Sequence, residues 1–327
     1  MLSPSAARQT VRTATEPAAP PRMTIASIRS GRIDAPIRTL LHGVEGVGKT
    51  TFGANAPHPI FLGAEDGTGH LDVTRFPQPE KWAHVREAIA TLNAEPHGFE
   101  TLVIDTLDWA EPLLWAYICE RDNKRNVEDY GYGKGYVAAL DEWRVMIADL
   151  ERLRAAKRMQ IVLLAHTWIK PFKNPEGDDF DRYEMKIHPK AAGLLKEWSD
   201  VVLFANYETF AHKDDRTKRV RGVSTGARLA YTTRSAAYDA KNRFDLPESF
   251  PLDWTEYAAA MATDQVADPA ALVAEIMRKA KELGGETGAK ALALAAEHGG
   301  DASYLAKINN KLNARLAEQA AAGEVAQ

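Results

Sequence analysis

Hydrophobic residues in the first two thirds of the chain follow two alternating periods. Between Ile37 and about Phe204, short aliphatic runs predict strands at 37–42, 60–64, 101–105, 161–165 and 201–206. Between these runs, apolar residues recur every three or four positions, which predicts helices with one buried face. These positions are Trp82, Val85, Ile89 and Leu92, and then Leu140, Trp143, Ile147, Leu150 and Leu153. Strands that alternate with helices are typical of a mostly parallel sheet, so we predict an α/β fold.

The pattern changes twice after Phe204. Alternating residues interrupted by Asp214-Asp215-Arg216, Gly222 and Gly226 predict antiparallel hairpins that close one edge of the sheet. Beyond about Thr263 the chain is rich in alanine, and helices are expected near 269–283, 286–297 and 301–321. We therefore expect a disordered N-terminal tail (1–35), a main α/β domain (36–262) and a small helical C-terminal domain (263–327).

One segment carries a motif with well-defined chemistry. It fills every fixed position of G-x-x-x-x-G-K-[ST], the P-loop that surrounds nucleotide phosphates with backbone N–H groups. The residues are Gly43, Val44, Glu45, Gly46, Val47, Gly48, Lys49 and Thr50, and a helix is expected to continue from Thr51. Lys49 is expected to contact the β- and γ-phosphates, and the Thr50 hydroxyl to hold Mg²⁺. The segment predicts that the chain binds ATP or GTP.

Three strand ends are expected to complete this site. Asp105 ends the apolar run 101–105 and is the expected Walker B aspartate, which helps to hold Mg²⁺. Glu65 follows the strand 60–64 and is expected to orient or deprotonate the attacking water. Asp66 is an alternative, and either residue can instead cap a helix. His166 follows the strand 161–165 and is expected to sense the γ-phosphate, with a structural role left open.

Composition excludes several classes of protein. The 327 residues are 45% hydrophobic, which is enough for one large domain and an appendage. A formal net charge of −4 excludes a uniformly basic nucleic-acid-binding protein. Cys119 is the only cysteine, which excludes an internal disulfide or a multi-cysteine zinc site and favours a reducing cytoplasm. No apolar run approaches the roughly 20 residues that span a bilayer, so no integral membrane protein is expected.

The first 22 residues are rich in Ala, Pro, Ser, Thr and Arg and lack the apolar stretch of a secretory signal. A disordered tail, or a true start at Met23, is one interpretation. An organelle transit peptide is the other, because Arg8, Arg12 and Arg22 are opposed only by Glu16.

The order of motifs resembles that of the RecA-like ATPases. The segment Phe61-Leu62-Gly63-Ala64-Glu65-Asp66 is similar to the catalytic glutamate segment of recombinases. Asp105 resembles their Walker B aspartate, and His166 lies where that family has a polar γ-phosphate sensor. No N/T-K-x-D segment for guanine follows at a suitable place, so the resemblance favours ATP.

Two further segments resemble phage-encoded RecA-like single-strand annealing ATPases. They are Tyr130-Gly131-Tyr132-Gly133-Lys134-Gly135-Tyr136 and Asp239-Ala240-Lys241-Asn242-Arg243, and the resemblance covers roughly residues 36–255. It implies ATP-linked binding of single-stranded DNA, with annealing or strand exchange aided by a single-strand binding protein. For a phage-encoded protein, this activity belongs in the cytoplasm of the bacterial host.

The segment 241–243 also resembles the one by which hexameric ATPases insert cations into a neighbouring subunit's nucleotide site. The resemblance implies a homo-oligomer, either a ring or a filament. Arg243 is then the expected arginine finger, which reaches the nucleotide of the neighbouring subunit (in trans), and Lys241 is expected to assist it. Such a cation stabilises charge on the γ-phosphate. A solvated cationic turn is the alternative.

Two kinds of surface are candidates for DNA binding. Residues 212–243 hold nine Lys or Arg against three Asp, which suits DNA phosphates or a neighbouring subunit's ATP. The segments 124–136 and 167–190 are expected to be loops, and they match in position the two DNA-binding loops of recombinases. Their aromatic and cationic residues suit base stacking and phosphate contact, with packing or a subunit contact as the alternative. They are Tyr130, Tyr132, Lys134, Tyr136, Trp168, Lys170, Phe172 and Lys173.

Two other functions stay open. An ATP-driven helicase loader or packaging accessory would act on a protein partner held by the C-terminal helices. A small-molecule kinase is disfavoured because no acceptor-binding lid or second arginine cluster stands out in the sequence.

Overall fold

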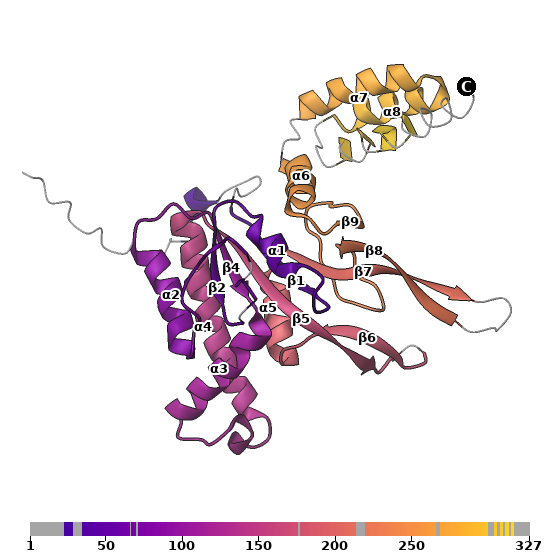
Figure 1. Ribbon diagram of the computed structural model, residues 1–327. Helices are drawn as coiled ribbons and strands as arrows, with labels where there is room; N and C mark the ends of the chain where they lie inside the picture. The colour runs from indigo at the N-terminus through magenta and orange to yellow at the C-terminus, as the bar shows by residue number, and fades with distance from the viewer. Residues whose placement is uncertain are drawn as a thin grey trace, which may run out of the picture. The chain divides into compact units, whose positions relative to one another are not determined.

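The computed structural model describes most of the chain between Met23 and Leu316 (Figure 1). The described residues are 23–28, 35–65, 67–69, 71–175, 177–213, 220–265, 269–299, 304–305, 308–309, 311–313 and 315–316. The chain divides into two units, Met1–Asp34 and Ala35–Gln327. In the described part of the first unit, the short 3-10 helix η1 (Ile25–Ser27) follows Thr24, whose backbone N–H donates to the Ser27 hydroxyl.

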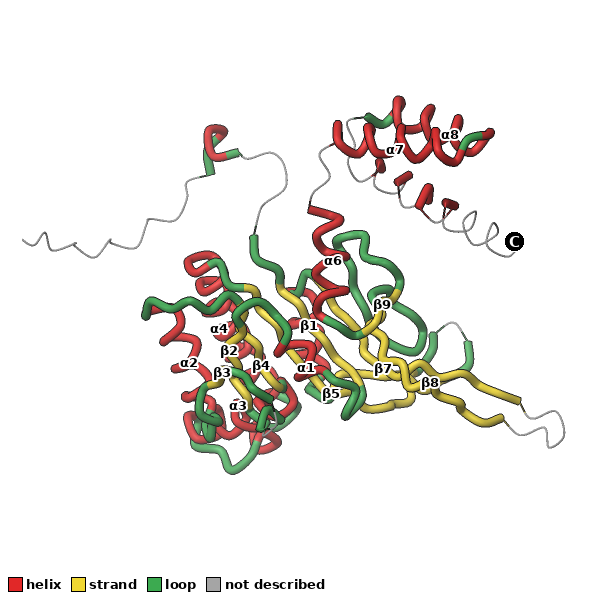
Figure 2. Tube along the Cα trace, turned by 45° about the horizontal axis from the view of Figure 1, so that its top comes forward, coloured by secondary structure: helices red, strands yellow, loops and turns green. Residues whose placement is uncertain are grey.

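The second unit is built on a mixed sheet with nine strands in its described part (Figure 2). Its parallel centre has the order β2-β4-β5-β1-β7, and the strands are β1 (Arg38–Gly43), β2 (Pro59–Gly63), β4 (Thr101–Asp105), β5 (Gln160–Phe172) and β7 (Val201–Lys213). The parallel strand β3 (Thr74–Arg75) pairs with β2 at one edge. The antiparallel strands are β6 (Phe180–Met185), which pairs with β5, and β8 (Val220–Tyr231) and β9 (Ser249–Pro251), which follow β7.

Successive residues of the central strands face opposite sides of the sheet, and both sides are buried. Leu40, Ile104 and Leu163 belong to one core, whereas Leu41 and Val103 belong to the other. The first core is completed by α2 (Trp82–Ala94), α3 (Leu107–Arg121), α4 (Lys134–Lys157) and α5 (Pro189–Trp198). The second is completed by α1 (Lys49–Ala54) and α6 (Trp254–Gln265). Burial on both faces explains why the central strands read as continuous apolar runs.

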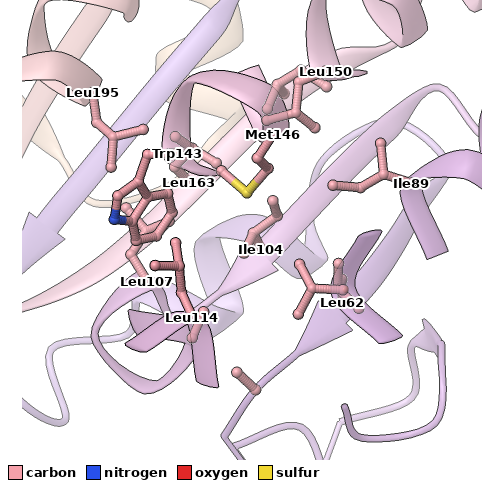
Figure 3. Packing of buried hydrophobic residues seen from close by; sticks show 14 of the residues in the cluster. Leu62, Ile89, Ile104, Leu107, Leu114, Trp143, Met146, Leu150, Leu163 and Leu195 are labelled. Carbon is pink, nitrogen blue, oxygen red and sulfur yellow. The ribbon is translucent and has the colours of Figure 1, made fainter. Parts of the chain in front are cut away.

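Large side chains of α4 fill the first core. Trp143 and Met146 point toward Leu163 and Ile104 of the sheet (Figure 3), and all four side chains are at most 1% exposed. Trp143 also meets Trp82 of α2 edge-on, with 5.4 Å between the ring centroids. This packing accounts for the helical spacing of both residues in the sequence.

The C-terminal helices have a hydrophobic core of their own. α7 (Pro269–Leu283) and α8 (Gly285–Glu297) are joined at Gly284, which has a φ of +66°. Their core joins Ile276 and Ala280 of α7 to Ala291 and Ala295 of α8, together with Leu305, Ile308 and Leu312. Within the described part of the chain, no helix combines the length and the apolar character needed to cross a membrane.

The predicted α/β class is confirmed, with a mostly parallel sheet, an antiparallel edge and a helical C-terminal region. The expectation of loops at 124–136 and 167–190 is wrong in part. The first segment contains the 3-10 helix η2 (Val127–Tyr130) and the start of α4. The second is mainly a hairpin, because β5 continues past the core to Phe172 and pairs with β6. The helix expected at 301–321 lies largely outside the described residues.

Candidate nucleotide site

The P-loop motif lies between the end of β1 and the start of α1, which is the strand–loop–helix context that such a loop needs. Gly43 must be glycine, because a Cβ there would lie 2.3 Å from the Ala205 carbonyl oxygen of β7. Gly48 has a φ of +106°, a left-handed conformation that residues with a Cβ rarely adopt. The fold therefore requires two of the glycines of the motif.

Lys49 is buried at the centre of this loop. Its Nζ donates to the carbonyl oxygens of Gly43, at 3.2 Å, and Val44, at 3.0 Å. Burial lowers the pKa of the Lys49 ammonium below its ordinary value, although the carboxylates of Asp108 and Asp105 oppose this effect. A buried cation beside three glycines suits a phosphate group, which would supply the countercharge that the loop carbonyls supply only in part.

Thr50 and Asp105 meet as expected for a magnesium site. The Thr50 hydroxyl donates to Asp105 Oδ2 at 2.8 Å. Burial raises the pKa of Asp105 above its ordinary value, and the hydrogen bond from Thr50 opposes the rise. Gly67 lies beside this pair, since an added Cβ would be in van der Waals contact with both residues, at 3.8 Å from Thr50 Oγ1 and 3.9 Å from Asp105 Oδ2. A hydroxyl and a carboxylate are hard oxygen ligands, so these two residues fit Mg²⁺.

His166 joins two carboxylates beside the P-loop lysine. Its Nδ1 lies 2.9 Å from Asp108 Oδ2 and 3.9 Å from Glu65 Oε2, and its backbone N–H donates to Asp108 Oδ1 at 2.9 Å. Burial alone would raise the pKa of Asp108, but the hydrogen bonds from His166 outweigh it and hold that pKa below the ordinary value. Asp108 is therefore ionised, and it orients the imidazole by accepting from Nδ1–H.

Neighbouring strands bring this cluster together. β5, which carries His166, lies between the strand of the P-loop and the strand that ends at Asp105. Glu65 is held beside the same point, because its backbone N–H and that of Ala64 donate to the Asp105 carbonyl oxygen, at 3.3 and 2.8 Å. Lys49, Thr50, Asp105, Glu65 and His166 thus share one end of the sheet, whereas Asp66 lies outside the described residues.

Asp108 was missed in the sequence. Its only signal is a carboxylate three positions after Asp105, in the first turn of α3. The contact with His166 depends on the pairing of β4 with β5, which sequence spacing does not reveal.

Lys241 and Arg243 lie at the opposite end of the sheet from the P-loop. Lys241 Nζ donates to three carbonyl oxygens at the end of α5, those of Lys196, Glu197 and Ser199, at 2.9, 3.0 and 2.6 Å. Such a cation satisfies the last carbonyls of the helix. Arg243 Nη1 lies 3.2 Å from Asp200 Oδ1, just before β7, and its side chain is 51% exposed. The fold therefore separates both cations from the nucleotide site of their own chain.

Asp239, in the same segment, holds several elements together. Its carboxylate accepts from Arg182 of β6 and Lys196 of α5, and lies 3.4 Å from Arg234 Nε. Its carbonyl oxygen is 2.8 Å from His42 Nε2, beside the P-loop. Asp239 therefore ties the hairpin and α5 to the strand of the P-loop.

The DNA-binding candidates between residues 130 and 136 differ in their contacts and in their exposure. The Tyr130 hydroxyl donates to the Ile118 carbonyl oxygen at 2.8 Å and to Asp122 at 2.7 Å, so this ring is held by α3. Tyr136 stacks on His188, with 4.1 Å between the ring centroids. Tyr132 is fully exposed, and Lys134 opens α4. Tyr132 is thus the aromatic side chain of this segment that is accessible to a ligand.

The second set lies on the β5–β6 hairpin. Trp168 is 40% exposed, and Lys170 Nζ lies 3.8 Å from the centroid of its ring. Phe172 packs against Phe180, with 5.2 Å between ring centroids, and Lys173 is exposed just after the strand. Trp168, Lys170 and Lys173 therefore present stacking and cationic groups that begin two residues after His166.

The basic stretch 212–243 is only partly described. Residues 214–219 lie outside the described residues. Arg234, Lys241 and Arg243 each contact an acidic or carbonyl group of their own chain, as given above. Arg228 instead lies against the P-loop, which no feature of the sequence indicated. The described cations of this stretch therefore contact different parts of the fold.

A P-loop on a mostly parallel α/β sheet, whose threonine hydrogen-bonds to an aspartate at the end of another strand, is typical of P-loop nucleoside triphosphatases. A family model described as an AAA domain matches residues 35–244, so the chain belongs to that family. No curated protein matches the chain.

Among solved structures, the chain is similar to the RadB recombinase, at 14% identity over 65% of this chain and 84% of that one, with a TM-score of 0.38. It is also similar to the flagellar accessory protein FlaH from Methanocaldococcus jannaschii, at 10% identity over 60% of this chain and 77% of that one, with a TM-score of 0.33. Neither likeness is close enough to indicate function.

Proposed function

We propose that the chain binds ATP with Mg²⁺ and hydrolyses it in a reaction coupled to single-stranded DNA, in phage-type annealing or strand exchange. The observation that carries the ATPase is the convergence of Lys49, the Thr50–Asp105 pair and the Glu65–His166–Asp108 cluster at one end of the sheet. These groups supply the cation, the metal ligands and the base that phosphoryl transfer to water requires.

Each residue has a separate task in this proposal. The P-loop amides and Lys49 bind the phosphates, and Thr50 and Asp105 hold Mg²⁺, which neutralises phosphate charge when it is bound. Glu65 orients the attacking water and accepts its proton on a carboxylate that is one-third exposed. His166, oriented by Asp108, contacts the γ-phosphate or Glu65 and changes partners when that phosphate leaves.

The hairpin that begins beside His166 supports the coupling to DNA. β5 carries His166 at the nucleotide site and, on the same strand, Trp168 and Lys170 on the exposed part. A strand is stiff enough to move these groups together, so a shift of His166 on hydrolysis would reach the DNA-binding side chains. Exposed aromatics beside cations bind single strands without sequence preference.

The position of Arg243 excludes a role at the P-loop of its own chain. Its partner Asp200 lies just before β7, whereas the P-loop follows the far end of β1, roughly 16 Å away for five strand residues. Arg243 therefore cannot serve its own P-loop, and a finger role requires a neighbouring subunit. Lys241 would have to leave its three carbonyl partners to assist, so Arg243 is the stronger candidate in trans.

The test is an ATPase assay with and without single-stranded DNA over a range of salt, with oligomer size measured in parallel. We expect ATP hydrolysis that DNA stimulates, no nucleotide binding by Lys49→Ala, and ATP binding with turnover reduced at least about 100-fold in Glu65→Gln. Glu87→Gln, on the exposed face of α2, is the matched control and should behave as wild type.

The outcomes separate the competing functions. ATP hydrolysis that DNA never changes, with no DNA binding in gel shifts, would end the DNA proposal. In that case, recovery of a replication or packaging protein by the C-terminal helices would favour a loader. Normal turnover by Glu65→Gln would remove Glu65 from its assigned role and turn attention to Asp66.

A further inference from the structure

The antiparallel β7–β8 hairpin lays two side chains on the P-loop. Tyr207 of β7 and Arg228 of β8 are direct partners in the register of this hairpin. The Tyr207 hydroxyl donates to the Gly46 carbonyl oxygen at 2.9 Å. Arg228 Nη1 lies 2.8 Å from the point where a Cβ of Gly48 would stand. Both contacts fall inside the motif 43–50, so the hairpin is a wall of the nucleotide site.

Arg228 differs in its charge environment from Arg234 and Arg243 of the same basic stretch. Arg234 faces Asp239 and Arg243 faces Asp200. Within the described part of the chain, no carboxylate lies within ion-pair distance of Arg228. The side chain is exposed, so its conformation is open to a ligand that approaches the loop from solvent.

A guanidinium at this place raises the positive charge on a loop that already holds Lys49. Two cations that share one loop repel each other, whereas an anion between them is attracted to both. Arginine also offers a planar set of donors that matches the oxygens of a phosphate. The arrangement is therefore favourable when the loop holds a phosphate and less favourable when it is empty.

We propose that Arg228 is a second phosphate-binding cation of the nucleotide site, supplied in cis by the β7–β8 hairpin. The inference rests on the proposed function, because it requires that the P-loop binds a nucleotide. It also makes the hairpin responsive to the nucleotide, since β8 carries a group that pairs with the phosphates and β7 carries the Tyr207 hydroxyl bonded to the loop.

A purely structural role for Arg228 makes different predictions. If the guanidinium only supports the Gly48 backbone, its removal would lower the stability of the nucleotide-free protein and would not distinguish between ligands. A phosphate-binding guanidinium would matter for affinity, more for ligands with more phosphates, and lysine would restore part of the effect. A group that stacks on the base would affect adenosine as much as ATP.

The experiment measures the affinities of wild type, Arg228→Ala and Arg228→Lys for ATP, ADP and adenosine by calorimetry, at low and high salt. Arg144→Ala, which changes an exposed arginine on α4, is the matched control. We expect Arg228→Ala to weaken ATP binding about tenfold at low salt and less at high salt, with adenosine unaffected. Arg228→Lys should recover part of the loss, and the melting temperature of Arg228→Ala without nucleotide should not fall, because the change removes a like charge from the empty loop.

Wild-type affinity for ATP in Arg228→Ala would overturn the inference while leaving the proposed function intact. An equal loss for adenosine, or a lower melting temperature without nucleotide that lysine does not restore, would also overturn it. If the wild type binds no nucleotide at all, the proposed function fails first and this inference fails with it.

Discussion

Glu111 is a buried carboxyl group one helical turn beyond Asp108 on α3, and its replacement by glutamine tests how the interior behind the nucleotide site is built. The side chain is 4% exposed. Its two oxygens accept from the backbone N–H of His188, at 3.1 and 2.9 Å, just before α5. Glutamine keeps the shape and one acceptor at this contact but removes the ionisable group.

The magnitude follows from the pKa of this group. Burial raises the pKa of Glu111 from 4.5 to about 7, and the charge on Asp108 adds to the rise against the hydrogen bond from His188. Because the folded protein keeps the proton that the unfolded chain releases, stability falls as pH rises from about 4.5 to about 7. At about 1.4 kcal/mol for each pH unit, the loss is on the order of 3 kcal/mol.

Urea unfolding at pH 5, 6, 7 and 8 would measure this effect for wild type, Glu111→Gln and the exposed control Glu87→Gln. Between pH 5 and pH 8, the free energy of unfolding of Glu111→Gln should rise relative to that of wild type by about 2.5 kcal/mol, because part of the loss in wild type has already occurred at pH 5. The control should follow wild type at every pH. A difference between Glu111→Gln and wild type that stays constant with pH, or that falls as pH rises, would show that Glu111 ionises freely and refute the reasoning.

Three other predictions concern the DNA surface, the subunit contact and the ion-pair network. Trp168→Ala should weaken binding of single-stranded DNA at least about fivefold in fluorescence anisotropy, while ATP affinity stays at the wild-type value; unchanged DNA affinity would argue against stacking on Trp168. Mixed oligomers of Arg243→Ala and Lys49→Ala subunits should regain ATPase activity that neither variant has alone, because an intact finger then faces an intact P-loop. No recovery in a proven mixture would count against a finger in trans. Asp239→Asn should lower the free energy of unfolding by about 3 kcal/mol in urea titration, because it leaves the buried Arg182 without its countercharge; an unchanged value would mean that other groups compensate.

The parallel centre of the sheet could be predicted closely from the sequence. The strand expected at 101–105 is β4 without any shift, and the helix expected at 269–283 is α7. These elements are buried on both faces or on one stripe, so their patterns follow from burial alone. β5 and β7 run beyond their predicted ends to Phe172 and Lys213. Their outer parts leave the apolar core and continue as hairpins, where backbone pairing rather than burial maintains the strand.

The residues of the candidate site also differ in whether the sequence predicts them. Lys49 and Thr50 could be placed because the P-loop is a contiguous motif whose geometry is local. Glu65 and Asp105 could be proposed because carboxyl ends of parallel strands meet at one edge. Asp108 and Arg228 could not, because each reaches the site only through the pairing of distant strands, β4 with β5 and β7 with β8.

The sequence by itself determined the class of fold, the phosphate-binding loop and the strand that carries Asp105, because hydrophobic period and a local motif encode these features directly. Only the tertiary structure decided which groups surround that loop. It placed Asp108 on His166, Arg228 against Gly48, and Lys241 on the carbonyls at the end of α5. A cation or carboxylate looks the same in any sequence, and its partner is decided by the strands and helices that bring it within a few ångströms of another charge.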